Sequence, residues 1–512
     1  MTRLTRRELI ATGAAAGVLA ASGLPARAMP RRGGTLRAVL PGASVADSWD
    51  ARRHQGLFMA AAGMGAVFEC LTEITADGSL RGELATRWTG SRDARVWRLY
   101  LREDVRFHNG KAFGAEDVIA SLDLHRDPAG RSPAWPIVAD ITAMRARGSH
   151  AVEITLARGN ADFPYLLSDY HLLIYPAGQI ERAMRDGIGT GPYRVVLFEP
   201  GQRLRAARID DHWKDGQAAW FDGIDLVAEP AGHARVDALR AARTDVAAGL
   251  PAAAIAGLSK DSALSLHVTR GNQFTALELF TQGAPFDAVA LRRALAHAID
   301  RQGLVDTVLA GHGTVGADTP VSPLAPYHAA LPVPEFDPDR ARDILRRADL
   351  SRLRVALPVS DVLHPSAVEM AWHMRDSARA AGIDLAVREQ RAAVHGPTPD
   401  IPLVQTAWWG RPTEDWMLSS AFVPGADWAK TGWDGGASFQ AHLAEARASF
   451  DPALRAEIYR DLQTRIAADA PMIVPAFADH LQATRKTVAT PAQIGAMWPM
   501  DNARFAQRWW MA

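Results

Sequence analysis

Aromatic rings and charges gather in one short stretch of the second half of the chain, which reads Trp408-Trp409-Gly410-Arg411-Pro412-Thr413-Glu414-Asp415-Trp416. It follows an apolar segment, Ile401 to Thr406, that is typical of a strand, and loops after strands in α/β proteins often meet ligands. Arginine offers paired donors to a carboxylate, and indole rings supply apolar surface beside it. The predicted ligand contacts are Trp408, Trp409, Gly410, Arg411, Asp415 and Trp428, with Trp433 as a further wall.

Two alternatives to this interpretation stay open. In the first, the tryptophans belong to the core and Arg411 is solvated. In the second, Asp415 rather than Arg411 reaches the ligand, and an amine then fits as well as an acid.

Patterns that would indicate catalysis are missing from the sequence. There is no phosphate loop, no GxSxG elbow and no HExxH among the sixteen histidines. The run Gly311 to Gly316 matches GxGxxG, but it follows an expected helix and precedes Pro320 and Pro323, so it offers no helix N-terminus to a pyrophosphate. Cys70 is the only cysteine, which excludes an internal disulfide and a thiolate cluster. We expect no catalytic residue, no cofactor and no intrinsic metal site.

The first residues form a targeting segment. Arg6-Arg7 stand in a twin-arginine pattern, Ala11 to Leu24 is small and apolar, and Ala26-Arg27-Ala28 suits cleavage. We expect residues 1–28 to be removed on export to the periplasm, without a lipid anchor because no cysteine lies near the cleavage site. Removal takes away four arginines and one glutamate, so the formal charge falls from zero to about −3, which disfavours nucleic acid as a partner.

The elements that must position the loop are clearest in the first half of the chain. A Gly-Pro turn leads into an expected strand, Tyr193 to Phe198, which Pro200-Gly201 turns back into Arg203 to Arg208. Alternation of Trp97, Leu99 and Leu101 with charged neighbours predicts a half-buried strand, and Ala115 to Val118 opens a helix with two acids in its first turn. Up to about residue 270 we expect one strand-rich lobe.

Beyond residue 270 the pattern becomes α/β, and a chain of this length needs more than one core. Leu353 to Leu357, a helix after Pro365 and a strand from Ile383 to Arg388 predict a strand–helix–strand unit. The acids expected to cap helices here are Asp287, Asp300, Asp337 and Asp451.

Several of these segments together resemble the large solute-binding proteins of peptide-type ABC importers, family 5. They include Gly189 to Tyr193, the block from Trp97 to Val118, and Pro285-Phe286-Asp287 with Leu291 to Leu295. The resemblance covers nearly the whole mature chain. It implies an α/β, two-lobed periplasmic-binding-protein fold of type II, in the large cluster-C form, with an extra subdomain roughly at 50–185 in the first lobe. Lobe I is expected at 29–270 plus 479–512 and lobe II at 271–478.

The resemblance implies a monomeric receptor that closes on a small peptide or a peptide-like, acidic amphipathic solute and delivers it to an ABC permease. Two departures matter. Phe280 stands where the family usually has asparagine, and Arg411 stands near the position where peptide binders hold the ligand's ammonium group with an aspartate. Arg411 therefore favours an acidic group on the ligand.

Two other functions are kept as alternatives. One is a receptor of the same fold that binds a metal chelate or haem. The other is an enzyme exported by the twin-arginine route, which often carries proteins already folded around a cofactor.

Overall fold

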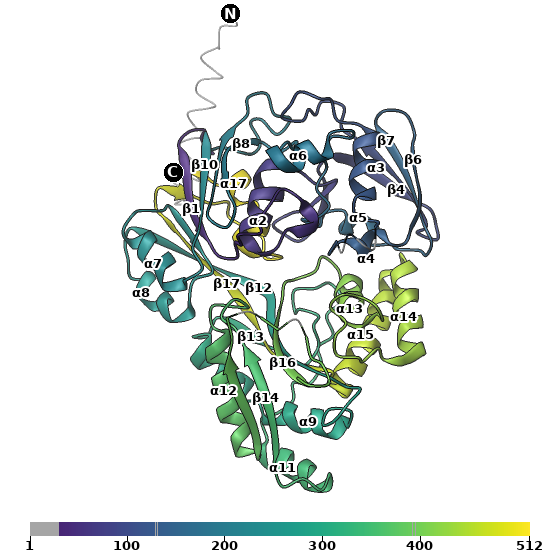
Figure 1. Cartoon of the computed structure of the whole chain (residues 1–512), viewed down its shortest axis with the longest axis vertical. Coiled ribbons are helices and arrows are strands. Elements are labelled where there is room, and N and C mark those ends of the chain that lie inside the picture. Colours follow the sequence, from purple (N-terminus) through teal and green to yellow (C-terminus); the bar gives the residue numbers. More distant parts are fainter. Residues whose placement is uncertain (1–29, 128–129, 131, 392, 395) are drawn as a thin grey trace, which may run out of the picture.

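The computed structural model describes residues 30–127, 130, 132–391, 393–394 and 396–512. The expected leader, residues 1–28, lies outside the described residues. The chain forms two parts, one above the other in Figure 1, and the long strands β12 (Leu264–Leu279) and β17 (Met472–Arg485) run between them. These strands pair antiparallel along most of their length, so one two-stranded ribbon joins the two parts.

A nine-stranded sheet forms the frame of the molecule. Its strand order is β16-β12-β17-β11-β1-β10-β9-β8, with β13 paired to β17 off this path. Besides β12 and β17 the strands are β16 (Leu403–Trp408), β11 (Val246–Ala248), β1 (Thr35–Leu40), β10 (Gly223–Ala228), β9 (Arg203–Arg208), β8 (Tyr193–Glu199) and β13 (Gly313–Val315).

The hairpin expected at residues 193–208 is present as β8 and β9, paired antiparallel. Its rigid entry has a steric cause, because a Cβ atom on Gly189 would lie 2.1 Å from the carbonyl oxygen of Val67, and one on Gly191 would lie 2.3 Å from that of Ala66. Only glycine allows the backbone to approach so closely.

A smaller four-stranded sheet, β4-β5-β7-β6, lies beside the frame in the upper part. The alternation predicted around Trp97 is confirmed, since Trp97, Leu99 and Leu101 are buried in β5 (Val96–Leu101). The helix predicted at Ala115 is α3 (Ala115–Asp123), and the Asp117 carboxylate accepts the Gly114 amide at its start. The other strands are β4 (Ala85–Gly90), β6 (Ile141–Ala146) and β7 (Ala151–Leu156).

The strand–helix–strand unit is confirmed in the lower part as β14 (Leu353–Val359), α12 (Ala367–Ala380) and β15 (Ile383–Glu389), with the two strands parallel. Asp337 caps α11 (Pro338–Arg347), Asp451 caps α15 (Pro452–Asp469) and Asp300 caps α10 (Arg301–Gly303), as predicted. The prediction for Asp287 is wrong by one residue: α9 (Val289–Ala298) starts after Ala288, and Asp287 accepts the Ala288 amide.

The remaining helices and strands lie around these units, and most of them are short. They are η1 (Ala51–Arg53), α2 (Gly56–Ala62), η2 (Gly63–Val67), β2 (Thr72–Ile74), β3 (Leu80–Gly82), α4 (Trp135–Val138), α5 (Phe163–Leu166), α6 (Ile180–Asp186), α7 (Gly232–Arg240), η4 (Ala252–Ala254), α8 (Ile255–Leu258), η5 (Leu304–Val308), α13 (Glu414–Phe422), α14 (Gly436–Ala448), β18 (Val488–Ala489), α16 (Pro499–Asn502), α17 (Phe505–Arg508) and β19 (Trp510–Met511).

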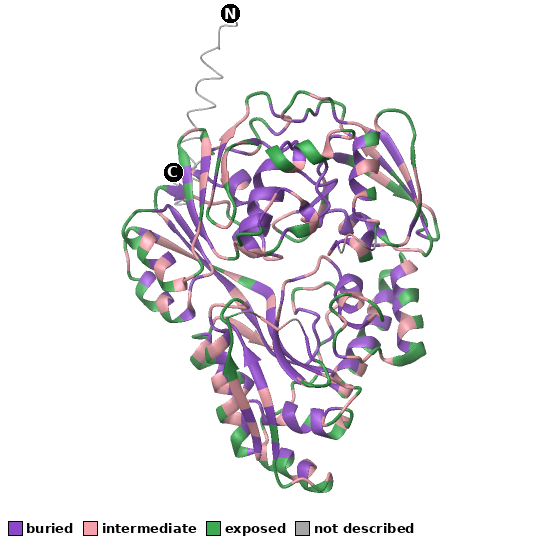
Figure 2. Ribbon diagram, in the orientation of Figure 1, coloured by how far each residue is buried: buried purple, intermediate pink, exposed green. Residues whose placement is uncertain are grey.

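Buried apolar side chains gather in separate clusters. The largest lies in the upper part and draws mainly on residues 36–248 and 488–509, whereas two others lie in the lower part and draw on residues 274–478. Figure 2 shows the central strands buried and the outer faces of α11 and α14 exposed. We propose the lobe boundaries expected from the sequence, 29–270 with 479–512 and 271–478, and use lobe I and lobe II below in that sense.

Candidate functional site at the boundary between the lobes

The stretch predicted to bind a ligand is divided among three elements. The strand expected at Ile401 to Thr406 runs two residues further, so Trp408 ends β16 instead of opening a loop. Helix α13 begins at Glu414, where the Thr413 hydroxyl accepts the Trp416 amide. The loop is therefore residues 409–413 only, because pairing with β12 holds Trp408 opposite Phe274 in the sheet.

Trp408 is buried in the core of lobe II. Its ring stacks on Phe274 with centroids 6.1 Å apart, and its indole N–H donates to Oε1 of Glu278 over 2.8 Å. Trp428, 40% exposed, lies 5.7 Å from the Trp408 ring. Trp433 packs against Phe422 and Phe439 in the same core. These indoles pack within lobe II.

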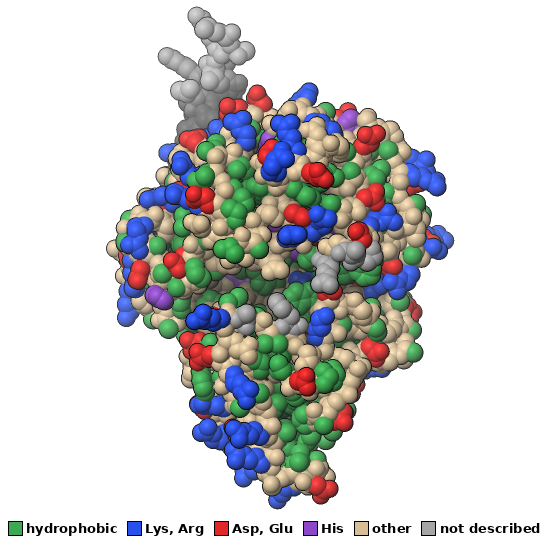
Figure 3. Space-filling model, in the orientation of Figure 1, with side chains coloured by type: hydrophobic (Ala, Val, Ile, Leu, Met, Phe, Trp, Pro, Cys, Tyr) green, Lys and Arg blue, Asp and Glu red, His purple; other side chains and the backbone are tan. Residues whose placement is uncertain are grey.

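Trp409 and Gly410 instead meet lobe I. The Trp409 ring lies 6.2 Å from Tyr170, which in turn lies 5.9 Å from Trp498 in an edge-on arrangement. The Trp498 indole N–H donates to the Gly410 carbonyl over 3.0 Å. Three aromatic rings from two lobes thus surround the start of the loop, and Figure 3 shows the surface hollowed along this boundary.

Glycine at position 410 has a steric cause. A Cβ atom there would lie 2.1 to 2.2 Å from the amide group of Asn272, whose nitrogen in turn lies 3.2 Å from the sulfur of Met497. A side chain at 410 would push Asn272 aside and shift the loop.

Arg411 is half-buried and differs from the buried arginines of the chain. Among the described residues it has no hydrogen-bond or ion-pair partner, and its Nε atom is closed off from solvent. Burial lowers the pKa of its guanidinium, which nearby Tyr170 and Asp169 oppose electrostatically. A guanidinium that has lost part of its water without gaining a partner costs free energy, which an anionic ligand group would recover.

The lobe I side of Arg411 carries a paired acid. Oδ1 of Asp169 lies 2.6 Å from Nδ1 of His171 and also accepts the His171 amide, while Nε2 of His171 lies 3.1 Å from the His54 carbonyl. Burial would raise the pKa of Asp169, but His171 and Arg411 outweigh it and lower that pKa. The Asp169 carboxylate is therefore paired with His171 and forms no ion pair with Arg411.

Asp415 is committed within lobe II. Its two oxygens lie 2.9 and 3.0 Å from Nε of Arg447, and Ser419 also contacts it. The structure thus brings Trp409, Gly410 and Arg411 to the lobe boundary, and it places Trp408 and Asp415 in internal contacts. That these residues contact a ligand stays a prediction.

Sequence reasoning missed the lobe I residues Asp169, Tyr170 and Trp498. The run Asp162 to Tyr175 is visibly rich in aromatic residues, which was a usable signal for Tyr170. Nothing in the sequence pattern distinguishes Trp498 from other tryptophans. The GxGxxG match at residues 311–316 enters strand β13, so it offers no helix N-terminus, as expected.

The family model described as "Bacterial extracellular solute-binding proteins, family 5 Middle" matches residues 79–430. The chain belongs to family 5 of these solute-binding proteins. Members of this family are the binding proteins of ABC importers. The chain is therefore a solute-binding protein of an ABC importer. The resemblance noted in the sequence is thereby confirmed.

The relatives of this family 5 chain include the nickel-binding periplasmic protein of Escherichia coli strain K12, 26% identical over 79% of this chain and 82% of the relative. The glutathione-binding protein GsiB of Pectobacterium atrosepticum is 26% identical over 78% and 80%. Among solved structures, AgaA from A. tumefacien R10, in complex with agropinic acid, superposes with a TM-score of 0.83 at 21% identity over 94% of this chain and 99% of that one. The two-lobed, cluster-C form of the periplasmic-binding-protein fold is confirmed.

Two features are absent from the residues that the structure describes. No cluster of three or more His, Cys, Asp and Glu side chains in this part of the chain could hold a metal ion. No helix there combines the length and apolar character needed to cross a membrane.

Proposed function

We propose that this receptor binds a small peptide or a peptide-like, acidic amphipathic solute between its lobes, with the acidic group on Arg411. The observation that carries the proposal is the unpartnered guanidinium of Arg411 at the lobe boundary. A carboxylate would supply two charge-assisted hydrogen bonds there. Trp409, Tyr170 and Trp498 would pack against the apolar part of the solute.

The proposal extends to the cell-level role. The receptor works as a monomer in the periplasm, reaches it by the twin-arginine route without a lipid anchor, and hands its solute to the transmembrane subunits of an ABC permease. Closure of the lobes around the solute is the device, because contacts act more strongly once water is excluded.

Relatives support a solute of this kind without fixing its identity. One binds nickel, one binds glutathione, and AgaA holds agropinic acid. The second candidate, a metal chelate, is favoured by the nickel-binding relative and by the same arginine, since an acidic chelator would present carboxylates to it.

The first experiment is a thermal-shift screen of residues 29–512 with di- and oligopeptides, opines, aromatic acids, and nickel with and without free histidine or EDTA. A ligand that binds only the folded state raises the melting temperature. A shift from acids and not from their amides supports the proposal. A shift that requires nickel and chelator together selects the second candidate, and equal shifts from acids and amides would refute the role given to Arg411.

The second experiment measures the affinity of the best compound for Arg411→Ala by calorimetry. We expect roughly 10- to 100-fold weaker binding, because a hydrogen bond to a charged group contributes about 1.5–3 kcal/mol. Arg411→Lys should lose less, since it keeps the charge but not the paired donors. Arg347→Ala, on an exposed side chain of α11, is the matched control and should bind as the wild type does.

A further inference from the structure

The lobes meet directly at a second place, formed by the turn between α14 and α15 and by the chain just before α5. The Ala161 amide of lobe I donates to the Arg447 carbonyl of lobe II over 2.7 Å. Nη2 of Arg455 lies 2.5 Å from Oδ2 of Asp162, with side chains only 9% and 6% exposed. A buried ion pair and a backbone hydrogen bond, both between protein groups alone, therefore cross the boundary.

The lobe II side of this contact is held firmly in place. The side chain of Arg447 is fixed by Asp415 and by the Ser419 hydroxyl, 2.5 Å from its Nη2. The guanidinium of Arg455 lies 5.1 Å from the centre of the Tyr327 ring. The turn is thus preorganised to meet lobe I, so little conformational entropy is lost when it docks.

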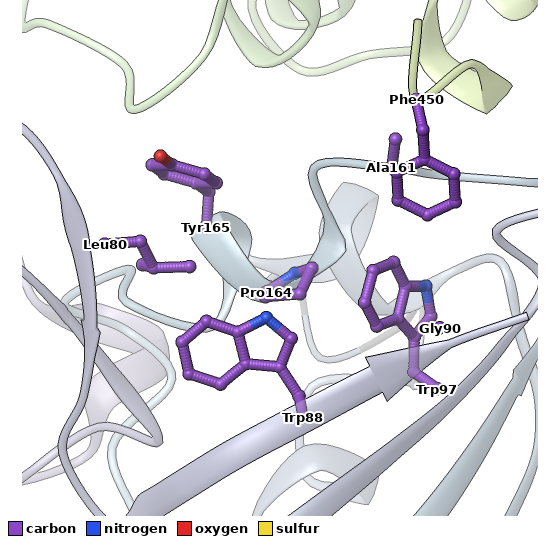
Figure 4. A pocket seen from close by; sticks show the side chains of 8 residues that line it. All are labelled: Leu80, Trp88, Gly90, Trp97, Ala161, Pro164, Tyr165 and Phe450. Carbon is purple, nitrogen blue, oxygen red and sulfur yellow. The ribbon is translucent and has the colours of Figure 1, made fainter.

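The apolar part of the contact is loose. Phe450 packs edge-on against Trp97 at 6.0 Å, yet half of its surface is exposed. An open cavity of about 480 Å³ lies here, lined by lobe I residues and by Phe450 of lobe II, and Figure 4 shows Phe450 reaching toward Trp97, with Trp88, Pro164 and Tyr165 along the opposite wall. Protein cores are close-packed, so this loosely packed contact resembles a surface that can separate and rejoin more than it resembles a core.

The ion pair decides whether closure is tolerated. When the lobes separate, Asp162 and Arg455 regain water, and when they close, each is the other's partner. An intact buried pair contributes little net stability, whereas a buried charge without its partner is strongly unfavourable. The pair therefore fixes one register of closure.

We propose that residues 161–162 and 447–455 form a latch whose protein–protein contacts allow the lobes to close independently of the solute. The latch acts on affinity indirectly, because a ligand binds more weakly when the competent arrangement is less populated. The inference rests on the two-lobed fold and on these contacts, and it does not depend on which solute Arg411 receives.

The test measures the distance between spin labels on the two lobes in the ligand-free protein. Labels are placed at Arg92→Cys and Glu445→Cys, two exposed positions on opposite sides of the boundary, while the native Cys70 is buried. We expect a closed population in the parent, and in Arg455→Met a fall of about tenfold or more in the ratio of closed to open molecules. A parent that is wholly open, or an Arg455→Met distribution identical to the parent's, would overturn the proposal.

Two further variants separate a latch from a folding defect. Replacing both partners, Asp162→Leu with Arg455→Met, should restore the closed population, because removing a buried pair altogether is nearly neutral. Arg460→Met, an exposed position on the same helix, should match the parent. If the double variant stays as open as Arg455→Met, the ion pair does not control closure and the proposal fails. Neither spin-label result changes the outcome of the thermal-shift screen. The latch and the proposed role of Arg411 are therefore tested separately.

Discussion

Two groups of buried charges behave in opposite ways in this molecule. In lobe I, Arg504 donates to both oxygens of Glu83 over 2.6 and 2.8 Å. Lys214 lies 2.9 Å from Glu69 and 2.6 Å from Glu83, and Arg508 pairs with Glu73 and Asp501. At the lobe boundary, Arg411 is half-buried, and its buried Nε atom has no hydrogen-bond partner among the described residues.

This difference in pairing distinguishes charges that stabilise the fold from a charge that we propose binds a ligand. Nearby acids raise the pKa of Arg504 despite its burial, whereas burial lowers the pKa of Arg411. A satisfied buried charge holds elements together, here α17 and the residue before it with β2 and the chain just after β3, and breaking it leaves an uncompensated partner. Charges with strongly perturbed surroundings cluster at functional sites, which is consistent with the ligand contact that we propose for Arg411.

The largest effect should come from Arg504→Met. It leaves Glu83 and Glu73 with less compensation inside the core, and we expect a loss of about 3–5 kcal/mol in the free energy of unfolding. Urea denaturation of the purified protein measures it. Arg347→Ala should change this free energy by less than about 0.5 kcal/mol, as exposed pairs do. A loss below about 1 kcal/mol for Arg504→Met would show that the lobe I network does not stabilise the fold.

Glu278 is an intermediate case, buried with hydrogen-bond donors but without a paired cation. Burial raises its pKa to about 7, against the hydrogen bonds from Thr406 and Trp408. Below about pH 4.5 the carboxyl is protonated in both folded and unfolded chains, and between about pH 4.5 and 7 only the unfolded chain ionises, so stability falls as pH rises.

Glu278→Gln should remove that dependence. The wild type should lose about 1–3 kcal/mol relative to the variant between pH 4.5 and 7.5, with no further change above that range. Denaturation at several pH values measures the difference, and Glu457→Gln, at an exposed position of α15, is the control. A wild-type curve parallel to that of Glu278→Gln would mean that the carboxyl is ionised in the fold.

The fold was predictable from the sequence where patterns are local. Hairpin turns, alternation in β5 and the capping acids Asp337 and Asp451 depend on neighbours a few residues away, and each was found as expected. The end of β16 was not predictable, because pairing with β12, over a hundred residues earlier, extends the strand to Trp408.

The site was predictable only in part, for the same reason. The loop around Arg411 was visible as a run of aromatic and charged residues. Which residue faces the boundary depends on partners distant in sequence. Arg447 pairs with Asp415, Glu278 accepts the indole N–H of Trp408, and Arg411 has no partner in the part of the chain that the structure describes. Pairing of this kind is a property of the folded chain, and no local pattern encodes it.

The smallest effect, and the sharpest contrast with Arg504, should come from Arg411→Met in the ligand-free protein. Removing a partly desolvated guanidinium that makes no bond to the described residues should raise the free energy of unfolding by up to about 1 kcal/mol, because the cost of burying the charge disappears while no partner is left unpaired. Arg447→Met, in the same lobe, should instead lower it, since Asp415 would stay buried alone. Urea denaturation without solute measures both. If Arg411→Met lost as much stability as Arg447→Met, Arg411 would be a structural residue like the lobe I arginines, and the assignment of the ligand's acidic group to it would fall with that result.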